Sequence, residues 1–108
     1  MAGRLTTHVL DTACGRGGTA MRVALRRISP APAVLAEIVL DADGRAALLE
    51  ADALIVGIYE LLFEVGAYYG TAGFLDQVPV RFRVDDADAD YHVPLIVSPF
   101  GYSTYRGG

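Results

Sequence analysis

Short hydrophobic stretches alternate with clusters of turn-forming residues along the whole chain. Apolar and polar side chains alternate most regularly in 78–84, Val-Pro-Val-Arg-Phe-Arg-Val, which is typical of a strand that buries one face. The stretch 5–10, Leu-Thr-Thr-His-Val-Leu, is rich in β-branched residues, which also favours a strand. The sequence contains no internal repeat and no linker, so we expect one continuous fold built from short strands.

The remaining hydrophobic stretches have less regular patterns. The stretch 54–63 fits a strand or a helix by periodicity alone, and its Ile, Val and Tyr content favours a strand. The stretch 65–72 is expected to form a short helix, although it contains two glycines. Seven or eight short strands with one short helix predict an all-β fold, a sandwich or a barrel. The other expected strands are 21–26, 34–40, 91–97 and 102–106.

The composition indicates the size and the assembly of the protein. A chain of 108 residues fits one domain, which we expect to cover residues 1–108. Hydrophobic residues make up 53% of the chain and the mean hydropathy is +0.35. Both values are high for so small a domain, so we expect part of its apolar surface to be buried between subunits.

The charge and the cysteine content exclude several classes of protein. The net charge of −4 argues against a nucleic-acid partner. No apolar stretch is long enough to span a membrane, and the N-terminal residues lack the apolar core of a secretory signal. The one cysteine, Cys14, permits no intrachain disulfide and has no nearby histidine to activate it. We therefore expect a cytoplasmic protein in which Cys14 is a bystander.

The two histidines, His8 and His92, are the main candidates for chemistry. Each lies within an expected strand, and His8 shares its strand face with Thr6 and Leu10, a mixed environment. A structural role for an isolated strand histidine is common and stays open. The spacing gives no zinc signature, because the chain has no HxxxH pair and only one cysteine.

Other polar clusters are weaker candidates. Arg45 follows the turn Asp43-Gly44 and is either a solvated loop residue or a group that binds a carbonyl or carboxylate through its planar donors. The acidic run 86–90 opens with the spacing of a calcium loop but lacks the glycine and the glutamate that such a loop needs, so we interpret it as a solvated turn. The glycine-rich stretch 15–18 matches no nucleotide-binding pattern.

The end of the chain is unusual because an aromatic-rich strand runs almost to the last residue. Chain termini usually fray, whereas 102–106 contains two tyrosines and an arginine. We expect this segment to be packed, for example at an interface.

Three segments together resemble the 5-hydroxyisourate hydrolases of the transthyretin-like family. They are 5–12, Leu-Thr-Thr-His-Val-Leu-Asp-Thr; the turn 43–45, Asp-Gly-Arg; and 91–107, which begins Tyr-His-Val-Pro-Leu-Ile-Val-Ser-Pro-Phe-Gly and ends Tyr-Arg-Gly. Their order and spacing agree with the family across nearly the whole chain. The first and last segments are long and specific, whereas the turn alone would carry little weight.

The resemblance implies a fold, an assembly and a reaction. The fold is a transthyretin-like β-sandwich of two four-stranded sheets with one short helix. The assembly is a homotetramer with the active cleft between dimers. The reaction, part of purine (urate) catabolism, is the hydrolysis of 5-hydroxyisourate, a cyclic amide, to 2-oxo-4-hydroxy-4-carboxy-5-ureidoimidazoline. No metal and no organic cofactor is implied, and the only other partner is the small-molecule substrate.

The resemblance also assigns roles to individual residues. His8, His92 and Arg45 match the catalytic positions: a histidine takes a proton from water, and Arg45 holds the carbonyl as negative charge develops. Gly108 departs from the family, in which a serine is usual at the end of the chain, and Gly17 stands where a proline is common. The residues implied to bind the substrate are His8, Arg45, Ser103, Tyr105, Arg106, Gly107 and Gly108.

Two other functions remain open on the sequence alone. The chain could be a transthyretin-like carrier that holds a small hydrophobic ligand without catalysis, although such a channel does not need two histidines and a Tyr-Arg-Gly ending. It could also be a zinc enzyme that uses the two histidines with ligands from distant segments.

Overall fold

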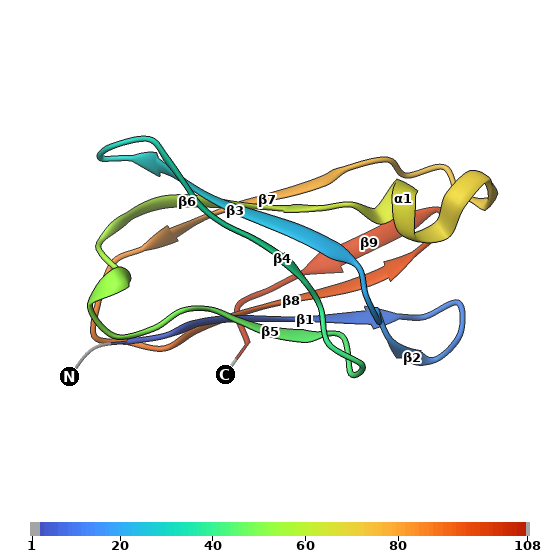
Figure 1. Ribbon diagram of the computed structural model, residues 1–108, viewed down its shortest axis with the longest axis horizontal. Coiled ribbons are helices and arrows are strands. Elements are labelled where there is room, and N and C mark those ends of the chain that lie inside the picture. The colour runs from blue at the N-terminus through green and yellow to red at the C-terminus, as the bar shows by residue number, and fades with distance from the viewer. Residues whose placement is uncertain (1–2, 108) are drawn as a thin grey trace.

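The computed structural model, which describes residues 3–107, consists of two β-sheets packed face to face (Figure 1). The expected β-sandwich with one short α-helix is confirmed. The first sheet contains β1 (Leu5–Asp11), β2 (Arg16–Gly17), β5 (Arg45–Leu49), β8 (Tyr91–Ser98) and β9 (Gly101–Thr104). The second sheet contains β3 (Arg22–Ser29), β4 (Ala33–Val39), β6 (Gly57–Phe63) and β7 (Val78–Val84).

Strand β1 lies in the middle of the first sheet. It pairs in parallel with β8 on one side, and with β5 and β2, both antiparallel, on the other. Strand β9 continues the sheet beyond β8. The sheet is therefore four strands wide, as expected, and the two-residue β2 is a small addition that shares an edge of β1 with β5. The second sheet is antiparallel throughout, in the order β4-β3-β6-β7.

The hydrophobic core lies between the two sheets, and the period of two along each strand builds it. In β1, Leu5, Thr7 and Val9 are buried whereas Thr6 and His8 are only partly buried. The same alternation places Leu25 of β3 and Leu61 of β6 in the core. Burying each such aliphatic side chain contributes roughly 1.5–3 kcal/mol, so the alternation fixes which face of each sheet points outward.

A buried carboxylate fastens the helix to one end of the sandwich. Helix α1 (Val65–Tyr69) supplies Tyr68 and Tyr69, whose hydroxyls donate to the two oxygens of Asp11 at 2.7 and 2.5 Å. Burial and the neighbouring carboxylate raise the pKa of Tyr68 to about 12, so this tyrosine stays a hydrogen-bond donor. The end of β1 is thereby tied to the segment that follows β6.

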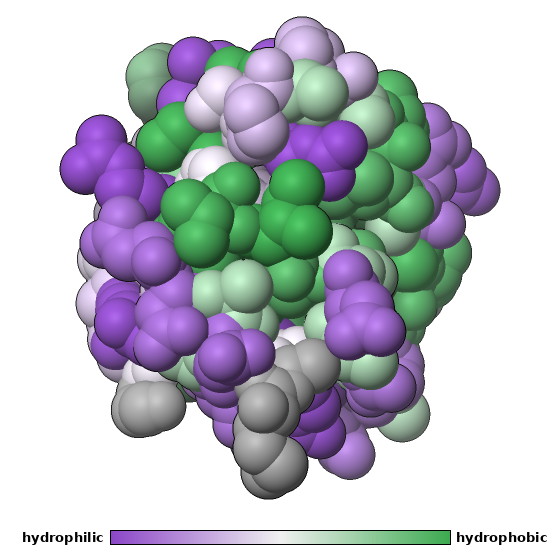
Figure 2. All heavy atoms as spheres, turned by 90° about the vertical axis from the view of Figure 1, so that its left-hand side faces the viewer, coloured by the Kyte–Doolittle hydropathy of each residue, from purple (hydrophilic) through white to green (hydrophobic). Residues whose placement is uncertain are grey.

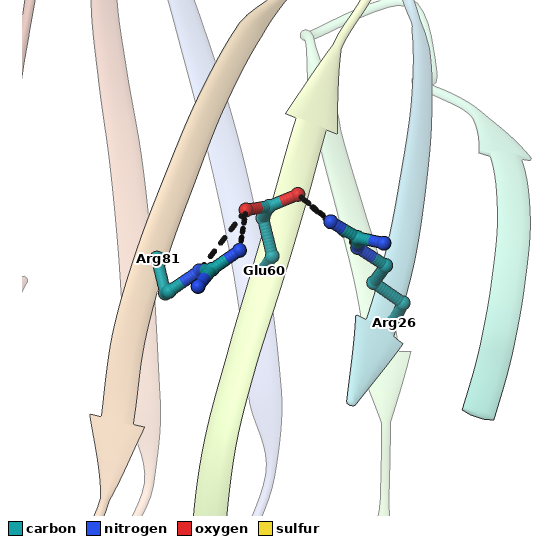
Figure 3. A network of polar contacts seen from close by, with 3 residues as sticks. All are labelled: Arg26, Glu60 and Arg81. Atoms are coloured by element: carbon teal, nitrogen blue, oxygen red, sulfur yellow. Dashed lines mark hydrogen bonds and ion pairs between the residues drawn. The ribbon is translucent and has the colours of Figure 1, made fainter. Parts of the chain in front are cut away.

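A second charged group lies on the outer face of the second sheet (Figure 3). Glu60 of β6 stands between Arg26 of β3 and Arg81 of β7 and accepts from both guanidinium groups, at 2.9 and 3.0 Å. Glu60 is 8% exposed, whereas the two arginine side chains are about half exposed. Burial alone would raise the pKa of Glu60, but the hydrogen bonds and charges of the two arginines bring it below its ordinary value.

Several expected boundaries were wrong. Strand β5 was not predicted, and the predicted strand 54–63 begins only at Gly57. The hydroxyl of Tyr59 accepts the N–H of Ile55 and donates to the Ile55 carbonyl. The backbone groups of Ile55 are therefore satisfied without a neighbouring strand. The helix ends at Tyr69 because Gly70 has a positive φ of 68°. The structure also contains two short 3-10 helices, η1 (Ala51–Ala53) and η2 (Gly70–Ala72).

Hydrophobic side chains gather at the end of the sandwich where β4 and β6 begin (Figures 1 and 2). Val34 near the start of β4 is 71% exposed, and Val56 just before β6 is 54% exposed. A Cβ added to Gly57 would meet Ser29 and Pro30, so the segment before β6 lies against the β3–β4 hairpin. The burial of apolar surface between subunits, which the composition led us to expect, stays a prediction.

Candidate functional site

Three strands that are distant in the sequence bring His8, Arg45 and His92 onto the outer face of the first sheet. Arg45, the first residue of β5, pairs directly opposite His8 of β1. On the other side of β1, Thr6 pairs with His92 of β8. Paired residues in a sheet point to the same face, so these four side chains share one surface.

The turn before β5 sets the position of Arg45. The Asp41 carboxylate accepts the backbone N–H groups of Asp43 and Arg45, both at 2.9 Å. The hydrogen bond from Arg45 is the main reason why the pKa of Asp41 lies below its ordinary value. Gly44 has a φ of +74°, and a Cβ there would lie 2.4 Å from the nitrogen of Gly18. Only glycine fits this turn without strain, so Asp43-Gly44 delivers Arg45 to the sheet.

A backbone carbonyl fixes the orientation of His8. Its Nε2 lies 3.1 Å from the carbonyl oxygen of Asp43. A carbonyl oxygen can only accept, so Nε2 must carry the hydrogen. In neutral His8 the free lone pair is therefore on Nδ1, and the same turn that positions Arg45 also selects the tautomer of His8.

His92 is held by a side chain and by the C-terminal segment. Its Nδ1 lies 2.8 Å from the hydroxyl of Thr6, and its backbone carbonyl accepts the N–H of Gly107 at 2.8 Å. Burial lowers the pKa of His92 below its ordinary value, and the nearby charges of His8 and Arg45 lower it further. This shift favours the neutral form of the His92 imidazole at neutral pH.

A hollow of about 270 Å³ opens beside Arg45 and His92, whereas His8 is not among the residues that line it. The guanidinium of Arg45 forms no hydrogen bond with any of residues 3–107, so it is free to bind a ligand. Within the same described range, no three His, Cys, Asp or Glu side chains are grouped in a way that could hold a metal ion. The hollow is lined by Arg4, Thr6, Thr7, Asp41, Arg45, Ala46, Ala47 and His92.

The C-terminal residues are divided between two places. Ser103 pairs opposite Ile96 and so lies on the outer face, and Gly107 lies against His92. Tyr105 and Arg106 instead line a separate cleft of about 270 Å³ between the open edges of the two sheets. Strand β9 ends at Thr104, so these two residues do not continue the strand as predicted.

Within the cleft, the guanidinium carbon of Arg106 lies 4.3 Å from the ring centre of Tyr91. Tyr91 is buried on the core side of β8, opposite to the face that carries His92. In the single chain Arg106 therefore points away from the two histidines. The role expected for Gly108 concerns a residue outside the part of the chain that the structure describes.

The sequence placed Thr6 on the strand face of His8 but did not reveal its contact with His92, and it did not single out Asp41. Thr6 lies two residues before His8 and therefore on the same strand face, but its contact with His92 depends on the parallel pairing of β1 and β8. Asp41 precedes the Asp-Gly turn, where an aspartate commonly accepts the backbone N–H two residues on. That local signal could have identified Asp41 as the residue that orders the turn. No local signal could have identified the contact between Thr6 and His92.

The group combines an imidazole that can accept a proton, a second imidazole in a fixed tautomer and an unpaired guanidinium. These are the parts that opening an amide by water requires: a base, a group that orients the substrate and a donor for the developing oxyanion. The arrangement is chemically capable of polar acyl-transfer chemistry.

Comparison with known proteins places this fold and site in a family. Residues 5–107 match the HIUase/Transthyretin family. The 5-hydroxyisourate hydrolase of Ralstonia nicotianae is 52% identical over 97% of this chain and 98% of its own length. Among solved structures, 5-hydroxyisourate hydrolase of Klebsiella pneumoniae superimposes with a TM-score of 0.86 at 32% identity and covers 98% of this chain and 99% of its own. A crystal structure of (S)-allantoin synthase has a TM-score of 0.93 at 41% identity; the match covers 99% of this chain and 44% of that one.

The chain belongs to the HIUase/Transthyretin family. Its relatives from Rhizobium meliloti and Ralstonia nicotianae, which match it over nearly their full length, are 5-hydroxyisourate hydrolases, and the prediction of an enzyme, specifically a hydrolase, is confirmed. None of the helices in the described residues has the length and apolar character needed to cross a membrane.

Proposed function

We propose that this protein hydrolyses 5-hydroxyisourate and opens its ring to give 2-oxo-4-hydroxy-4-carboxy-5-ureidoimidazoline. The observation that carries the proposal is the cross-strand group of His8, Arg45 and His92, in a chain 52% identical to a 5-hydroxyisourate hydrolase over nearly its full length. No step of the proposed reaction requires a metal or an organic cofactor. The cytoplasmic location expected from the sequence stays a prediction.

His92 acts as the base in this proposal. Its low pKa keeps it neutral near pH 7, and a neutral imidazole takes a proton from water as the water oxygen bonds to the ring carbonyl carbon. The carbon–nitrogen bond of the ring then breaks, and the imidazolium returns its proton to the departing nitrogen. Water thus supplies the new carboxylate oxygen and the proton on nitrogen, and His92 ends unchanged.

Arg45 and His8 hold the substrate for that attack. The unpaired guanidinium of Arg45 faces the carbonyl oxygen, where negative charge develops as water adds. The Nδ1 lone pair of His8 accepts a hydrogen bond from a ring N–H, because its Nε2 hydrogen is already committed to the Asp43 carbonyl. His8 therefore orients the substrate, whereas His92 moves the proton.

The C-terminal residues complete the site through assembly in this proposal. We expect a homotetramer in which the outer face of the first sheet meets another copy, so that Ser103 and the segment 105–108 reach a shared cleft. Leu10, which is 37% exposed on the same face as His8, supports such a contact. Specific activity should fall on dilution together with the tetramer fraction in analytical ultracentrifugation. A fully active monomer would contradict the assembly.

The two competing functions are separated by the same assay. A carrier should bind a small hydrophobic ligand without turning over 5-hydroxyisourate, and a zinc enzyme should lose activity in a chelator and regain it with zinc. The free guanidinium of Arg45 favours the hydrolase, because an apolar channel gains nothing from an unpaired cation.

The direct test is to add the purified chain to freshly generated 5-hydroxyisourate and follow its ultraviolet absorbance. The chain should accelerate the decay well above the spontaneous rate, in proportion to its concentration and unaffected by a chelator. Carbon-13 NMR should identify the ring-opened ureidoimidazoline as the first product. A decay rate equal to that of buffer alone would refute the proposed function.

A further inference from the structure

The hydroxyl of Thr6 contacts the His92 ring across the pairing of β1 and β8. Thr6 is partly buried on the outer face of β1, and its hydroxyl lies 2.8 Å from Nδ1 of His92 on β8. Backbone pairing already joins these two strands along their whole length. The side-chain contact therefore adds little to the sheet, but it acts directly on the ring that the proposed reaction uses.

The hydrogen bond decides which nitrogen of His92 is free. If Thr6 accepts from Nδ1–H, the lone pair is on Nε2; if Thr6 donates to Nδ1, Nε2 carries the hydrogen and cannot act as a base. After His92 takes a proton, both ring nitrogens carry hydrogen, whichever neutral tautomer came before. The oxygen of Thr6 must then accept a hydrogen bond from Nδ1. One orientation of the hydroxyl thus serves His92 both before and after proton transfer.

Gly107 confines the same ring from the other side. A Cβ built on Gly107 would lie 2.5 Å from Cδ2 of His92, the ring carbon next to Nε2. The N–H of Gly107 also donates to the backbone carbonyl of His92, which keeps the two residues in contact. With Thr6 on Nδ1 and Gly107 against Cδ2, the ring can turn only by breaking the Thr6 hydrogen bond.

We propose that Thr6 is a positioning residue that holds His92 in the tautomer with hydrogen on Nδ1, and that Gly107 fixes the ring so that Nε2 faces the substrate. This assignment rests on the proposed function for its catalytic meaning, but the tautomer itself is a property of the free protein. Neither residue touches the reacting atoms; both act through His92.

The first test observes the tautomer without any substrate. Nitrogen-15 NMR distinguishes a ring nitrogen that carries hydrogen from one that does not, and the two histidines are assigned with a His8→Gln variant. In the parent protein above the pKa of His92, the hydrogen should be on Nδ1. Thr6→Val removes the hydroxyl at nearly constant volume and should move the hydrogen largely to Nε2, whereas Thr6→Ser should restore the parental pattern.

The second test measures turnover of freshly generated 5-hydroxyisourate. Thr6→Val should lower kcat by about tenfold with little change in KM, equivalent to about 1.4 kcal/mol in the barrier, and Thr6→Ser should recover most of it. Thr12→Val is the matched control, because the Thr12 hydroxyl also donates across to β8, to the carbonyl of Val97, but far from His92. It should leave kcat within about twofold of the parent.

Gly107→Ala is an independent variant for the case in which Thr6→Val disturbs the strand. It should lower kcat and shift the His92 ring signals while circular dichroism stays unchanged. A His92 tautomer that is already mixed in the parent, or that Thr6→Val leaves unchanged, would overturn the proposal even if the chain is fully active. A parent without activity but with a Thr6-dependent tautomer would instead overturn the proposed function alone.

Discussion

The outer faces of the two sheets both carry arginine beside other ionisable groups, yet they treat the charge differently. On the second sheet, both oxygens of the buried Glu60 are occupied by Arg26 and Arg81 (Figure 3). On the first sheet, the Arg45 guanidinium has no hydrogen-bond partner within residues 3–107, and His92 is left neutral beside it.

The comparison distinguishes a charged group that joins strands from one whose donors are available to a ligand. A carboxylate that is saturated by two guanidinium groups ties three strands together and has no capacity left for a ligand. The Arg45 guanidinium lies near enough to the Asp41 carboxylate to lower its pKa, but within residues 3–107 it makes no hydrogen bond, so its donors remain available to a substrate. The difference in pairing, more than the residue types, supports the proposed site on the first sheet.

Among the groups that hold the substrate, the largest effect is expected from His8→Ala on the first sheet. Removing the group that orients the substrate beside Arg45 should lower kcat/KM by roughly 10²-fold. The measurement is the initial rate of 5-hydroxyisourate decay at matched tetramer concentration. A folded, assembled variant with near-parental turnover would return His8 to the structural role left open by the sequence.

On the second sheet, Glu60→Gln should affect stability instead. The amide keeps the shape but offers only one accepting atom to two arginines, and we expect the free energy of unfolding to fall by about 1–2 kcal/mol, a modest value because both arginines are half exposed. Urea unfolding at one protein concentration measures it. An unchanged free energy of unfolding would show that the ion pairs of Glu60 with Arg26 and Arg81 do not stabilise the fold.

A smaller effect on the first sheet is expected from Arg45→Lys. Lysine keeps the positive charge but loses the planar fork of donors, so kcat/KM should fall by about tenfold while the fold is unchanged. Arg81→Lys on the second sheet is the paired control, and its activity should match that of the parent. Equal rates for the parent and Arg45→Lys would favour a solvated role for Arg45.

The smallest expected effect is a shift in pH dependence. Burial and nearby positive charge lower the pKa of His92 from 6.5, so the acid limb of kcat/KM should lie below pH 6.5. Because the unfolded chain binds the proton more readily, stability from this residue is present above about pH 6.5 and is lost as the pH falls toward the folded pKa. Arg45→Gln should raise the pKa of His92 in an NMR titration. A pKa that does not respond would exclude Arg45 as one of its causes.

The sequence predicted the fold well where local patterns and family resemblance agreed. The regular alternation of 78–84 became β7, and the mixed face assigned to His8 became part of the outer face of one sheet. Strand β5 was missed because Arg45–Leu49 is mostly Ala and Leu, which have no preference for strands. Its pairing with β1 is a tertiary effect that no local pattern contains.

The resemblance named the members of the candidate site, and the geometry that relates them comes from the structure. The resemblance supplied His8, Arg45 and His92, whereas the link from Thr6 to His92 follows from a parallel pairing of strands that are 86 residues apart. Tyr105 and Arg106 were predicted to bind the substrate, and in the single chain they line the cleft between the sheet edges. Their role depends on assembly, which stays a prediction.

The most direct test of the central claim compares one substitution on the two faces. His92→Gln and Glu60→Gln each introduce the same uncharged amide on an outer sheet face, and both are assayed with fresh 5-hydroxyisourate under conditions in which each variant is folded. His92→Gln should lower kcat/KM by roughly 10²–10⁴-fold, as loss of a general base does, while Glu60→Gln stays within about twofold of the parent. Equal rates for the two variants, or a larger loss with Glu60→Gln, would contradict the assignment of the reaction to the first sheet.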